Sequence, residues 1–471
     1  MNYIPVIGLE IHAELLTKSK VFCSCANEFG GQSNTRVCPV CSGMPGALPT
    51  LNKDAVKLAI KAGLSLGCKI NNYSSFDRKN YFYPDLPKAY QITQQAFPIC
   101  SSGNVKIHDK NIQIERIHIE EDAGKLTHTE DNLSLIDYNR CGVGLIEIVT
   151  KPDFRSADEV VAFVDEVCLR LKYSGVCDGR LAEGSLRVDV NISVMSDDSD
   201  TLGTRTEIKN LNSLKSIKKA IEYETKRQIE LINNGEKVVM QTRRFDEETG
   251  TTILLRTKET APDYRFHTEP DLPPIYISDE QIEKIKNEMP KMPDERFLTY
   301  TQDYNLPKED ALLIIKDKDF SDFYDETAKI IKDYKSVKNL MLGELNHYLN
   351  KNKISVNNLK ITPQSLAELI KMCNDKIVTK NDSKSILKIM LDTGKNAYDI
   401  ASENNFIVKD NIKELALLAD EILLQNPDNV LKYKNGKLQL LGFFVGQLLK
   451  KAGKGTNPVV AKNILLEKLN K

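Results

Sequence analysis

The chain has 471 residues, well beyond the roughly 250 to 300 at which a single hydrophobic core stops growing, so we expect two or three domains. Hydrophobic residues make up 41% of it and charged residues 28%, a balance typical of a folded soluble protein and too apolar for a disordered one. Lys plus Arg (65) and Asp plus Glu (66) nearly cancel, which excludes a uniformly basic nucleic-acid coat and confines any RNA contact to a local patch.

The start of the chain carries no pattern of a targeting or membrane segment. No run of about 18 apolar residues occurs, so we expect no membrane span, and the first residues lack the basic and apolar regions of a signal peptide. We therefore expect a cytoplasmic protein, in which the ten Cys are reduced thiols or metal ligands and not disulfides.

The first part of the chain is rich in strand patterns, and the second part is helical. Period-two alternation or β-branched residues predict strands at residues 6–15, 111–121, 145–149, 184–194 and 204–210. From Met292 onward, apolar residues at spacings of three and four predict helices, for example at 319–333 and 337–350. Prolines cluster between Pro270 and Pro293, where we place the end of the first domain. A second boundary is expected near residues 399–405, before a last module of helices.

Four cysteines near the start have the spacing of a metal site. Cys23-x-Cys25 and Cys38-x-x-Cys41 are two close pairs separated by twelve residues, which lets two knuckles converge on one tetrahedral ion. Zinc is the expected ion, and four thiolates leave no open coordination position, so its role would be structural. Four unrelated buried thiols, or a redox Cys-x-x-Cys pair, are the alternatives.

The strand predicted at 6–15 has one apolar and one polar face. Glu10, His12 and Glu14 alternate with apolar residues, and such an open polar face can hold a cation. The same alternation places three further sets of polar side chains on strand faces: the acids 120–122, then Arg187 with Asp189 and Asn191, then Arg205 with Glu207 and Lys209. Carboxylates with one imidazole suit Mg²⁺ or Mn²⁺, and with Arg and Lys beside them they suit a nucleotide. The alternative is a half-solvated sheet with ordinary cross-strand ion pairs. No P-loop or complete Gly-x-Gly-x-x-Gly motif accompanies these strands, so any nucleotide site is of another type.

Residues 431–471 are strongly basic. They contain nine Lys and the single acid Glu467 in a chain of net charge -1. This asymmetry indicates a polyanionic partner, and a solvated Lys-rich surface is the alternative.

Several segments together resemble one family. They are Val6-Ile-Gly-Leu-Glu-Ile-His12, Asp77-Arg-Lys-Asn-Tyr-Phe-Tyr-Pro-Asp85, Pro87-Lys-Ala-Tyr-Gln91, His118-Ile-Glu-Glu-Asp-Ala-Gly-Lys125, Leu145-Ile-Glu-Ile-Val149, Glu183-Gly-Ser-Leu-Arg187 and Glu207-Ile-Lys-Asn-Leu-Asn-Ser213. In this order they resemble the B subunit of the bacterial glutamyl/aspartyl-tRNA amidotransferase. The resemblance is dense over the first 293 residues and looser toward the end, where the Gly442-x-x-x-Gly446 and 453–458 segments are similar to the family's terminal module.

The resemblance implies an α+β fold in three parts. These are a mainly antiparallel-sheet cradle domain with a zinc knuckle at 1–293, an all-α helical domain at 294–400, and an α-helical, tRNA-binding tail domain at 401–471. It also implies an enzyme, a carbon-nitrogen ligase of translation that uses glutamine as amido-nitrogen donor. With ATP, this subunit would phosphorylate the side-chain carboxylate of Glu-tRNA(Gln) and/or Asp-tRNA(Asn), and ammonia from an amidase subunit would then give the amide. The partners implied are the A and C subunits of a heterotrimer and mischarged tRNA, without DNA or a membrane.

The resemblance also implies roles for individual residues. Glu10, His12 and Glu121 are the catalytic residues and Mg²⁺ ligands it implies, with Glu120 the neighbour most easily confused with Glu121. The residues offered for ATP or the tRNA 3′ end are Lys79, Lys88, Arg187, Asp189, Glu207 and Lys209, and those offered for tail contacts with tRNA are Lys450, Lys451 and Lys454. The zinc knuckle would be structural, and the chemistry elsewhere would not depend on it.

Two other classes of function remain open at this point. A noncatalytic tRNA-binding scaffold would explain the basic tail but not the Glu-x-His strand. A metal-dependent hydrolase would use Glu10, His12 and the acids 120–122.

Overall fold

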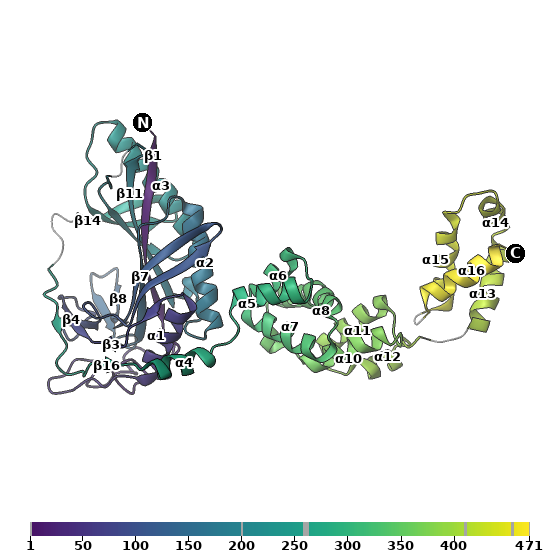
Figure 1. Cartoon of the computed structure of the whole chain (residues 1–471), viewed down its shortest axis with the longest axis horizontal. Coiled ribbons are helices and arrows are strands. Elements are labelled where there is room, and N and C mark those ends of the chain that lie inside the picture. Colours follow the sequence, from purple (N-terminus) through teal and green to yellow (C-terminus); the bar gives the residue numbers. More distant parts are fainter. Residues whose placement is uncertain (1, 199–200, 258–262, 409–411, 454–455, 471) are drawn as a thin grey trace. The chain divides into compact units, whose positions relative to one another are not determined.

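The computed structural model describes residues 2–198, 201–257, 263–408, 412–453 and 456–470. The chain divides into two compact units, Met1–Pro293 and Asp294–Lys471 (Figure 1). The first unit is built on a large sheet and the second is helical, which confirms the predicted α+β class.

The first unit is organised by a nine-stranded sheet. Its strand order is β14 (Thr251–Thr257), β13 (Gln241–Asp246), β12 (Thr206–Leu211), β11 (Leu186–Ser196), β1 (Tyr3–Glu14), β10 (Gly144–Thr150), β7 (Lys110–Glu121), β6 (Cys100–Ile107) and β2 (Lys69–Ile70). All neighbouring pairs are antiparallel except β12 and β13. The strands predicted from alternation correspond to β1, β7, β10, β11 and β12, so the sequence pattern located the middle of this sheet.

Three helices cover the apolar face of the sheet. They are α1 (Lys53–Ser65), α2 (Ala157–Tyr173) and α3 (Leu214–Asn233), and they share one core with the apolar residues of β1. In that core Ile7, Leu9 and Ile11 are buried together with Phe163 of α2 and Ile217 of α3. Burying one face in this way leaves the polar residues of the same strands on the opposite face, which is the face of interest for function.

Smaller elements complete the first unit. Three short sheets are formed by β15 (His267–Thr268), β4 (Asp77–Asn80) and β5 (Tyr90–Thr93), by β16 (Ile275–Tyr276) and β3 (Tyr73–Ser74), and by β8 (Lys125–His128) and β9 (Ser134–Asp137). The 3₁₀ turn Leu181–Glu183 precedes β11, and helix α4 (Asp279–Asn287) lies beside α1, where Lys57 Nζ is 2.7 Å from Glu288 Oε2.

The second unit contains two hydrophobic cores. The first is formed by α5 (Pro293–Leu298), α6 (Lys308–Ile315), α7 (Lys318–Ile331), α8 (Tyr334–Leu340), α9 (Asn346–Asn352), α10 (Pro363–Asn374), α11 (Lys380–Thr393) and α12 (Ala397–Glu403), with a 3₁₀ turn at Val356–Asn358. The second core is formed by α13 (Ile412–Gln425), α14 (Pro427–Lys434), α15 (Leu440–Ala452) and α16 (Pro458–Leu469).

Two details differ from the simple helical pattern. The helix predicted at 337–350 is interrupted by a π-helical segment, Met341–Leu345, which contains Gly343 and joins α8 to α9. Helix α12 runs across the expected boundary at residue 400, and Ile400 and Ala401 are both buried in the first core of this unit. None of the described helices is long and apolar enough to cross a membrane.

Candidate active site

The polar face of the sheet centres on β1, which pairs with β10 on one side and β11 on the other. Along β1 the buried residues Leu9, Ile11 and Ala13 alternate with Glu10, His12 and Glu14. Because both neighbours are antiparallel, His12 lies opposite Glu147 of β10 and opposite Arg187 of β11. The register therefore brings side chains from distant parts of the sequence around His12.

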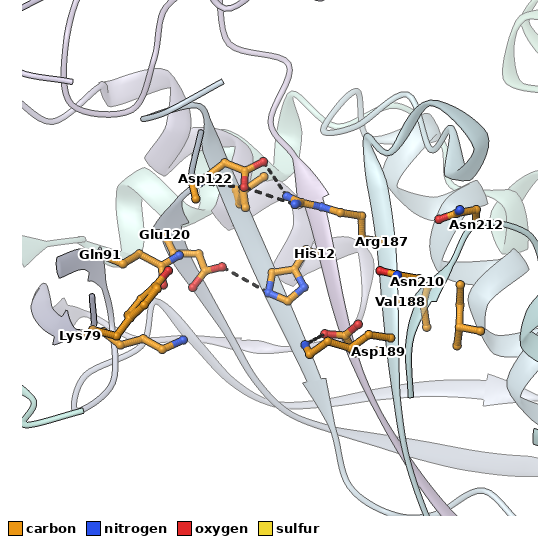
Figure 2. A pocket seen from close by; sticks show the side chains of 15 residues that line it. His12, Lys79, Gln91, Glu120, Asp122, Arg187, Val188, Asp189, Asn210 and Asn212 are labelled. Carbon is orange, nitrogen blue, oxygen red and sulfur yellow. Dashed lines mark hydrogen bonds and ion pairs between the residues drawn. The ribbon is translucent and has the colours of Figure 1, made fainter. Parts of the chain in front are cut away.

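His12 lies between two carboxylates. Its Nε2 atom is 3.3 Å from Glu120 Oε1 and 3.4 Å from Glu147 Oε2 (Figure 2 shows the contact with Glu120). A second imidazole joins them, since His118 Nε2 is 3.3 Å from the same Glu147 oxygen and 3.7 Å from Glu120. One ligand atom each from His12, Glu120 and Glu147 lie within 4.8 Å of one another, which is a donor set that suits a divalent cation such as Mg²⁺.

The protonation of this cluster follows from its charges. Burial alone would lower the pKa of His12, but the hydrogen bonds and charges of Glu120 and Glu147 outweigh it and raise the pKa to about 10. In the same way the pKa of His118 rises to about 9. Burial opposes ionisation of Glu120, yet hydrogen bonds from His118 and His12 lower its pKa to about 2. The cluster therefore favours the protonated form of both imidazoles and the ionised form of both carboxylates, and a metal ion that binds Nε2 of His12 would have to displace its proton.

A second group of acids lies on the same face of the sheet, around Glu10, which is two residues before His12 on β1. Single oxygens of Glu10, Asp189 and Glu207 lie within 4.8 Å of one another. Lys209 Nζ is 2.6 Å from Asp189 Oδ2 and 2.8 Å from Glu207 Oε1, and Asn191 donates to Glu10 at 3.0 Å. Burial, reinforced by Glu147, raises the pKa of Glu10. Unlike the group around His12, this group offers only oxygen ligands, as Mg²⁺ prefers.

His12 and Glu120 of the first group and Asp189 and Lys209 of the second line one cavity of about 330 Å³. Its lining includes His12, Glu120 and Asp189 together with the cations Lys79 and Arg187 (Figure 2), and a third cation, Lys209, lines it as well. Strands β4 and β5 bring in Lys79 and Gln91, and the turn after β12 brings in Asn212. The cavity therefore brings acidic side chains that can bind a metal ion next to Lys and Arg side chains that can bind phosphate.

The cations of the cavity differ in their partners. Arg187 Nη2 is 2.7 Å from Asp122 Oδ2, whereas its Nε is buried without a hydrogen-bond partner among the described residues. Lys79 makes no ion pair with a described carboxylate, and its Nζ lies 5.0 Å from the centre of the Tyr264 ring. An unsatisfied buried donor and an unpaired ammonium beside the acids are features that an anionic ligand would satisfy.

Glu121 does not join His12. Its carboxylate accepts from Lys88 Nζ at 2.6 Å and from the Ile92 backbone N–H at 3.0 Å. Alternation along β7 explains this difference, because adjacent residues of a strand face opposite sides, so Glu120 shares the face of His118 and Glu121 does not. Of the residues expected at the site, the structure thus groups His12 with Glu120, and Glu10 with Asp189, Glu207 and Lys209, while Lys88 pairs with Glu121 elsewhere.

Two residues of the cluster were not among those expected. Glu147 and His118 both lie within segments that carry the family resemblance, but their place beside His12 depends on which strands pair. Alternation within β10 and β7 assigns Glu147 and His118 to a polar face, whereas the partner strands of β1 cannot be read from alternation.

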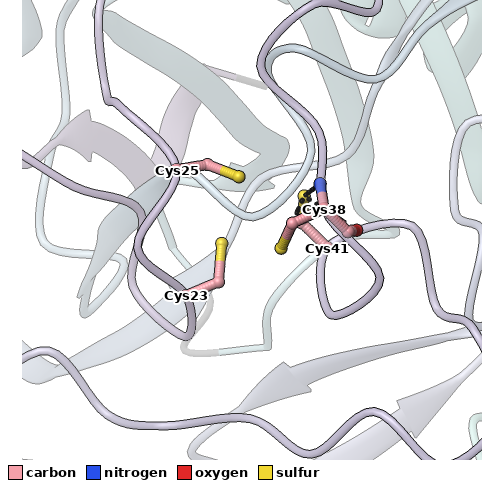
Figure 3. A group of neighbouring side chains, drawn as sticks. All are labelled: Cys23, Cys25, Cys38 and Cys41. Carbon is pink, nitrogen blue, oxygen red and sulfur yellow. Dashed lines mark hydrogen bonds between the residues drawn. The ribbon is translucent and has the colours of Figure 1, made fainter.

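The four cysteines also converge. The sulfur atoms of Cys23, Cys25, Cys38 and Cys41 all lie within 4.8 Å of one another, and their side chains point toward a common centre (Figure 3). Cys38 and Cys41 Sγ are 3.9 Å apart, close to the separation of about 3.8 Å between tetrahedral zinc ligands at about 2.3 Å from the ion. The hydrogen bond from Cys23, with a smaller contribution from the charge of Lys20, lowers the pKa of Cys41 below its ordinary value.

The tail lysines have mixed surroundings. Lys450 is exposed without an ion pair among the described residues, whereas Lys451 Nζ is 2.5 Å from Glu421 and Lys468 Nζ is 2.6 Å from Asp420. Both acids belong to α13, ahead of the basic segment. Lys454 lies outside the described residues.

Comparison with known proteins identifies the family. Residues 5–283 match the GatB/GatE catalytic domain, and residues 322–469 match the GatB domain. The chain belongs to the family of tRNA-dependent amidotransferase B subunits. The aspartyl/glutamyl-tRNA(Asn/Gln) amidotransferase B subunit of Caldicellulosiruptor saccharolyticus is 47% identical over 479 residues, covering all of both chains. The protein of the same name from Ruminiclostridium cellulolyticum is 48% identical, covering all of this chain and 98% of its own.

A more divergent relative gives the same result. The corresponding B subunit of Thermodesulfovibrio yellowstonii is 44% identical over 471 residues, covering 99% of each chain. The match to the GatB family thus spans both structural units and confirms the resemblance seen in the sequence motifs. The cavity described above lies entirely within the segment that matches the GatB/GatE catalytic domain.

Proposed function

We propose that this chain is the subunit that activates the side-chain carboxylate of Glu-tRNA(Gln) and/or Asp-tRNA(Asn) with ATP. The observation that carries the proposal is a cavity in which His12 and Glu120 of one acidic group and Asp189 of the other lie with Lys79, Arg187 and Lys209. A carboxylate is a poor electrophile at neutral pH, so an amide forms only after activation. Phosphoryl transfer uses acidic side chains that hold a divalent metal ion, together with Lys or Arg side chains that bind the phosphate groups.

The proposed reaction has two steps. A carboxylate oxygen of the mischarged aminoacyl group attacks the γ-phosphorus of ATP, the bond from phosphorus to the bridging oxygen breaks, and ADP leaves. Ammonia then attacks the acyl carbon, the carbon-oxygen bond to phosphate breaks, inorganic phosphate leaves, and the nitrogen loses a proton. The products are the amide, ADP and phosphate.

The roles of the residues follow from their positions. His12, Glu120 and Glu147 would form one Mg²⁺ site, and Glu10, Asp189 and Glu207 a second acidic group able to take a cation. Mg²⁺ held by these residues would neutralise charge on the transferred phosphoryl group. Lys79 and the free Nε of Arg187 would bind phosphate oxygens, and Lys209 would hold Asp189 and Glu207 in place. Lys88 and Glu121 form a buried pair outside this group, so we propose a positioning role for them.

The implied partners fit the same reaction. An acyl phosphate hydrolyses easily, so ammonia should arrive along an enclosed route from a glutaminase partner. The relatives are named as B subunits, which designates one chain of a multi-subunit enzyme. We propose an amidase (A) subunit, a small C subunit and mischarged tRNA as partners in the cytoplasm, and a structural zinc at the four cysteines.

One experiment separates this function from the alternatives. ATP-dependent release of phosphate, stimulated by mischarged tRNA and coupled to amide formation when ammonium salt is added, is expected for the proposed kinase. A noncatalytic scaffold would bind tRNA without releasing phosphate. A metal-dependent hydrolase would act without ATP.

A further inference from the structure

Lys20 is buried with 0% of its surface exposed, although it carries an ammonium group at the end of a long side chain. Burying such a charge is costly unless it is paired with an anion or fully hydrogen-bonded. Lys20 is not part of the candidate active site. Its burial therefore needs an explanation of its own.

The ammonium contacts the cysteine cluster. Lys20 Nζ donates to the carbonyl oxygens of Arg36 at 2.8 Å and Tyr138 at 3.3 Å, and it lies 3.6 Å from Cys41 Sγ. Throughout the described ranges, no carboxylate forms an ion pair with Lys20. The sulfur of Cys41 is thus the side-chain acceptor that this buried ammonium meets, and a cysteine sulfur carries a negative charge when it binds a metal ion.

The backbone around Lys20 is fixed to both cysteine pairs. Its N–H donates to the Cys25 carbonyl at 2.9 Å, and the next residue, Val21, donates to the Gly142 carbonyl at 3.0 Å. Gly142 has φ +83°, and a Cβ there would lie 3.3 Å from Cys41 Cβ and 3.6 Å from Lys20 Cδ. The stem of Lys20 is therefore enclosed between the Cys23/Cys25 arm and the Cys38/Cys41 arm.

Arg36, whose carbonyl accepts the hydrogen bond from Lys20, is itself held in place. Arg36 N–H donates to Asn139 Oδ1 at 2.8 Å, and the Arg36 guanidinium donates to the Gly30 carbonyl at 2.8 Å. Lys20 thus connects Cys25, Cys41 and the loop of Arg36 through a single side chain and its own peptide group.

We propose that Lys20 is a positioning residue that neutralises part of the charge of a tetrathiolate zinc centre. Four thiolates around Zn²⁺ leave two net negative charges in a partly buried site, and an ammonium donating N–H···S to one sulfur offsets one of them. This inference rests on the proposed zinc site and adds a residue that the spacing of the cysteines does not indicate. If Lys20 served only as a hydrogen-bond donor to the two carbonyls, replacing it would leave the affinity for zinc unchanged.

The test compares zinc retention in variants of the full chain. Lys20→Met removes the charge and the donor, Lys20→Gln keeps a donor without the charge, and Lys18→Met is the matched control, because Lys18 is exposed two residues away. Zinc content after dialysis and the rate of zinc transfer to a chelating dye are measured, with thermal unfolding in excess zinc as the check on folding. We expect Lys20→Met to lose zinc about 10- to 100-fold faster than the wild type, the usual scale for loss of a partner of a metal ligand, and Lys18→Met to match the wild type.

The outcomes distinguish the zinc site from the role of Lys20. A wild-type protein that holds no zinc overturns the zinc site itself. A wild type that holds zinc, with a folded Lys20→Met that releases it at the same rate, overturns the role of Lys20 alone.

A second measurement uses only the wild type and so does not depend on a variant that folds. Acetylation of amines, read by mass spectrometry before and after zinc is stripped, should reach Lys20 only after stripping and Lys18 equally in both states. Equal protection of Lys20 in both states contradicts the proposal.

Discussion

The Nε2 atom of His12 lies 3.3 Å from a carboxylate oxygen of Glu120, although 107 residues separate the two along the chain. This contact selects Glu120 over its neighbour Glu121, whose carboxylate is bound by Lys88. The choice between two adjacent acids is therefore made by the pleat of β7 and by the pairing of β7 and β1 with β10.

Glu120→Gln should abolish tRNA-dependent phosphate release, and Glu121→Gln should lower it far less. The first change removes a charged oxygen from the proposed metal group, and the second removes the partner of Lys88. We expect a loss of at least about 100-fold in kcat for Glu120→Gln, the scale on which one active-site electrostatic group contributes. Steady-state phosphate release by the complex measures both. If Glu121→Gln lowers kcat more than Glu120→Gln does, the metal ligand is Glu121, as the family resemblance implies, and not Glu120.

Binding of Mg²⁺ or Mn²⁺ should tighten as pH rises. The pKa of His12 is raised to about 10, so its Nε2 carries a proton at neutral pH that the metal must displace. Below that pKa, the apparent affinity should rise by about tenfold per pH unit for one displaced proton. Titration of Mn²⁺ at several pH values checks this. In His12→Gln the dependence should flatten, and an unchanged slope would place the ion elsewhere.

Lys79→Met should raise KM for ATP with little loss of stability. Lys79 lines the cavity and makes no ion pair with a described carboxylate, so no buried acid loses its partner. Loss of one charge-assisted hydrogen bond with phosphate predicts an increase of about tenfold. Lys69→Met, at an exposed position of β2, is the control. Equal KM values in the two variants would remove Lys79 from the nucleotide site.

The tail should supply affinity for tRNA, and the sheet domain the chemistry. Deletion of residues 409–471 leaves α12 intact and should raise KM for mischarged tRNA more than it lowers kcat, because remote contacts contribute uniform binding. The slope of log affinity against log salt should become shallower by about 0.7 to 0.9 for each phosphate group that the tail no longer neutralises.

A charge reversal provides a milder form of this test. The Lys450→Glu, Lys462→Glu pair changes two exposed lysines without ion pairs among the described residues, and it should weaken binding. Lys451→Gln is the control, since Lys451 is paired with Glu421. Unchanged tRNA affinity at low and high salt would show that the lysines form only a solvated surface.

The isolated chain should not hydrolyse glutamine, yet ammonium salt should support amidation with ATP and Mg²⁺. None of its Cys occurs in a Cys/His glutaminase arrangement that the sequence reveals, and it lacks a Ser-rich amidase pattern. Glutamate release measured with and without the amidase partner decides this. A rate from the chain alone that matches the full complex contradicts the proposed division of labour.

The sequence by itself determined the class of the fold, the family and the polar faces. Alternation located β1, β7, β10, β11 and β12, because burial of one face requires apolar residues at every second position. The dense spacing of Cys23, Cys25, Cys38 and Cys41 predicted a cluster that the structure contains, since local spacing limits where these sulfurs can lie.

The tertiary structure decided which polar residues of these strands lie next to one another. Glu147 and His118 join His12 only because β10 lies between β1 and β7, and the sequence does not state the order or register of strands so far apart. The same holds for Lys20, whose burial against Cys41, 21 residues further along the chain, depends on the path of two loops. Alternation is a local consequence of strand geometry, whereas strand order and charge pairing depend on contacts between distant residues, and those contacts assemble the candidate site.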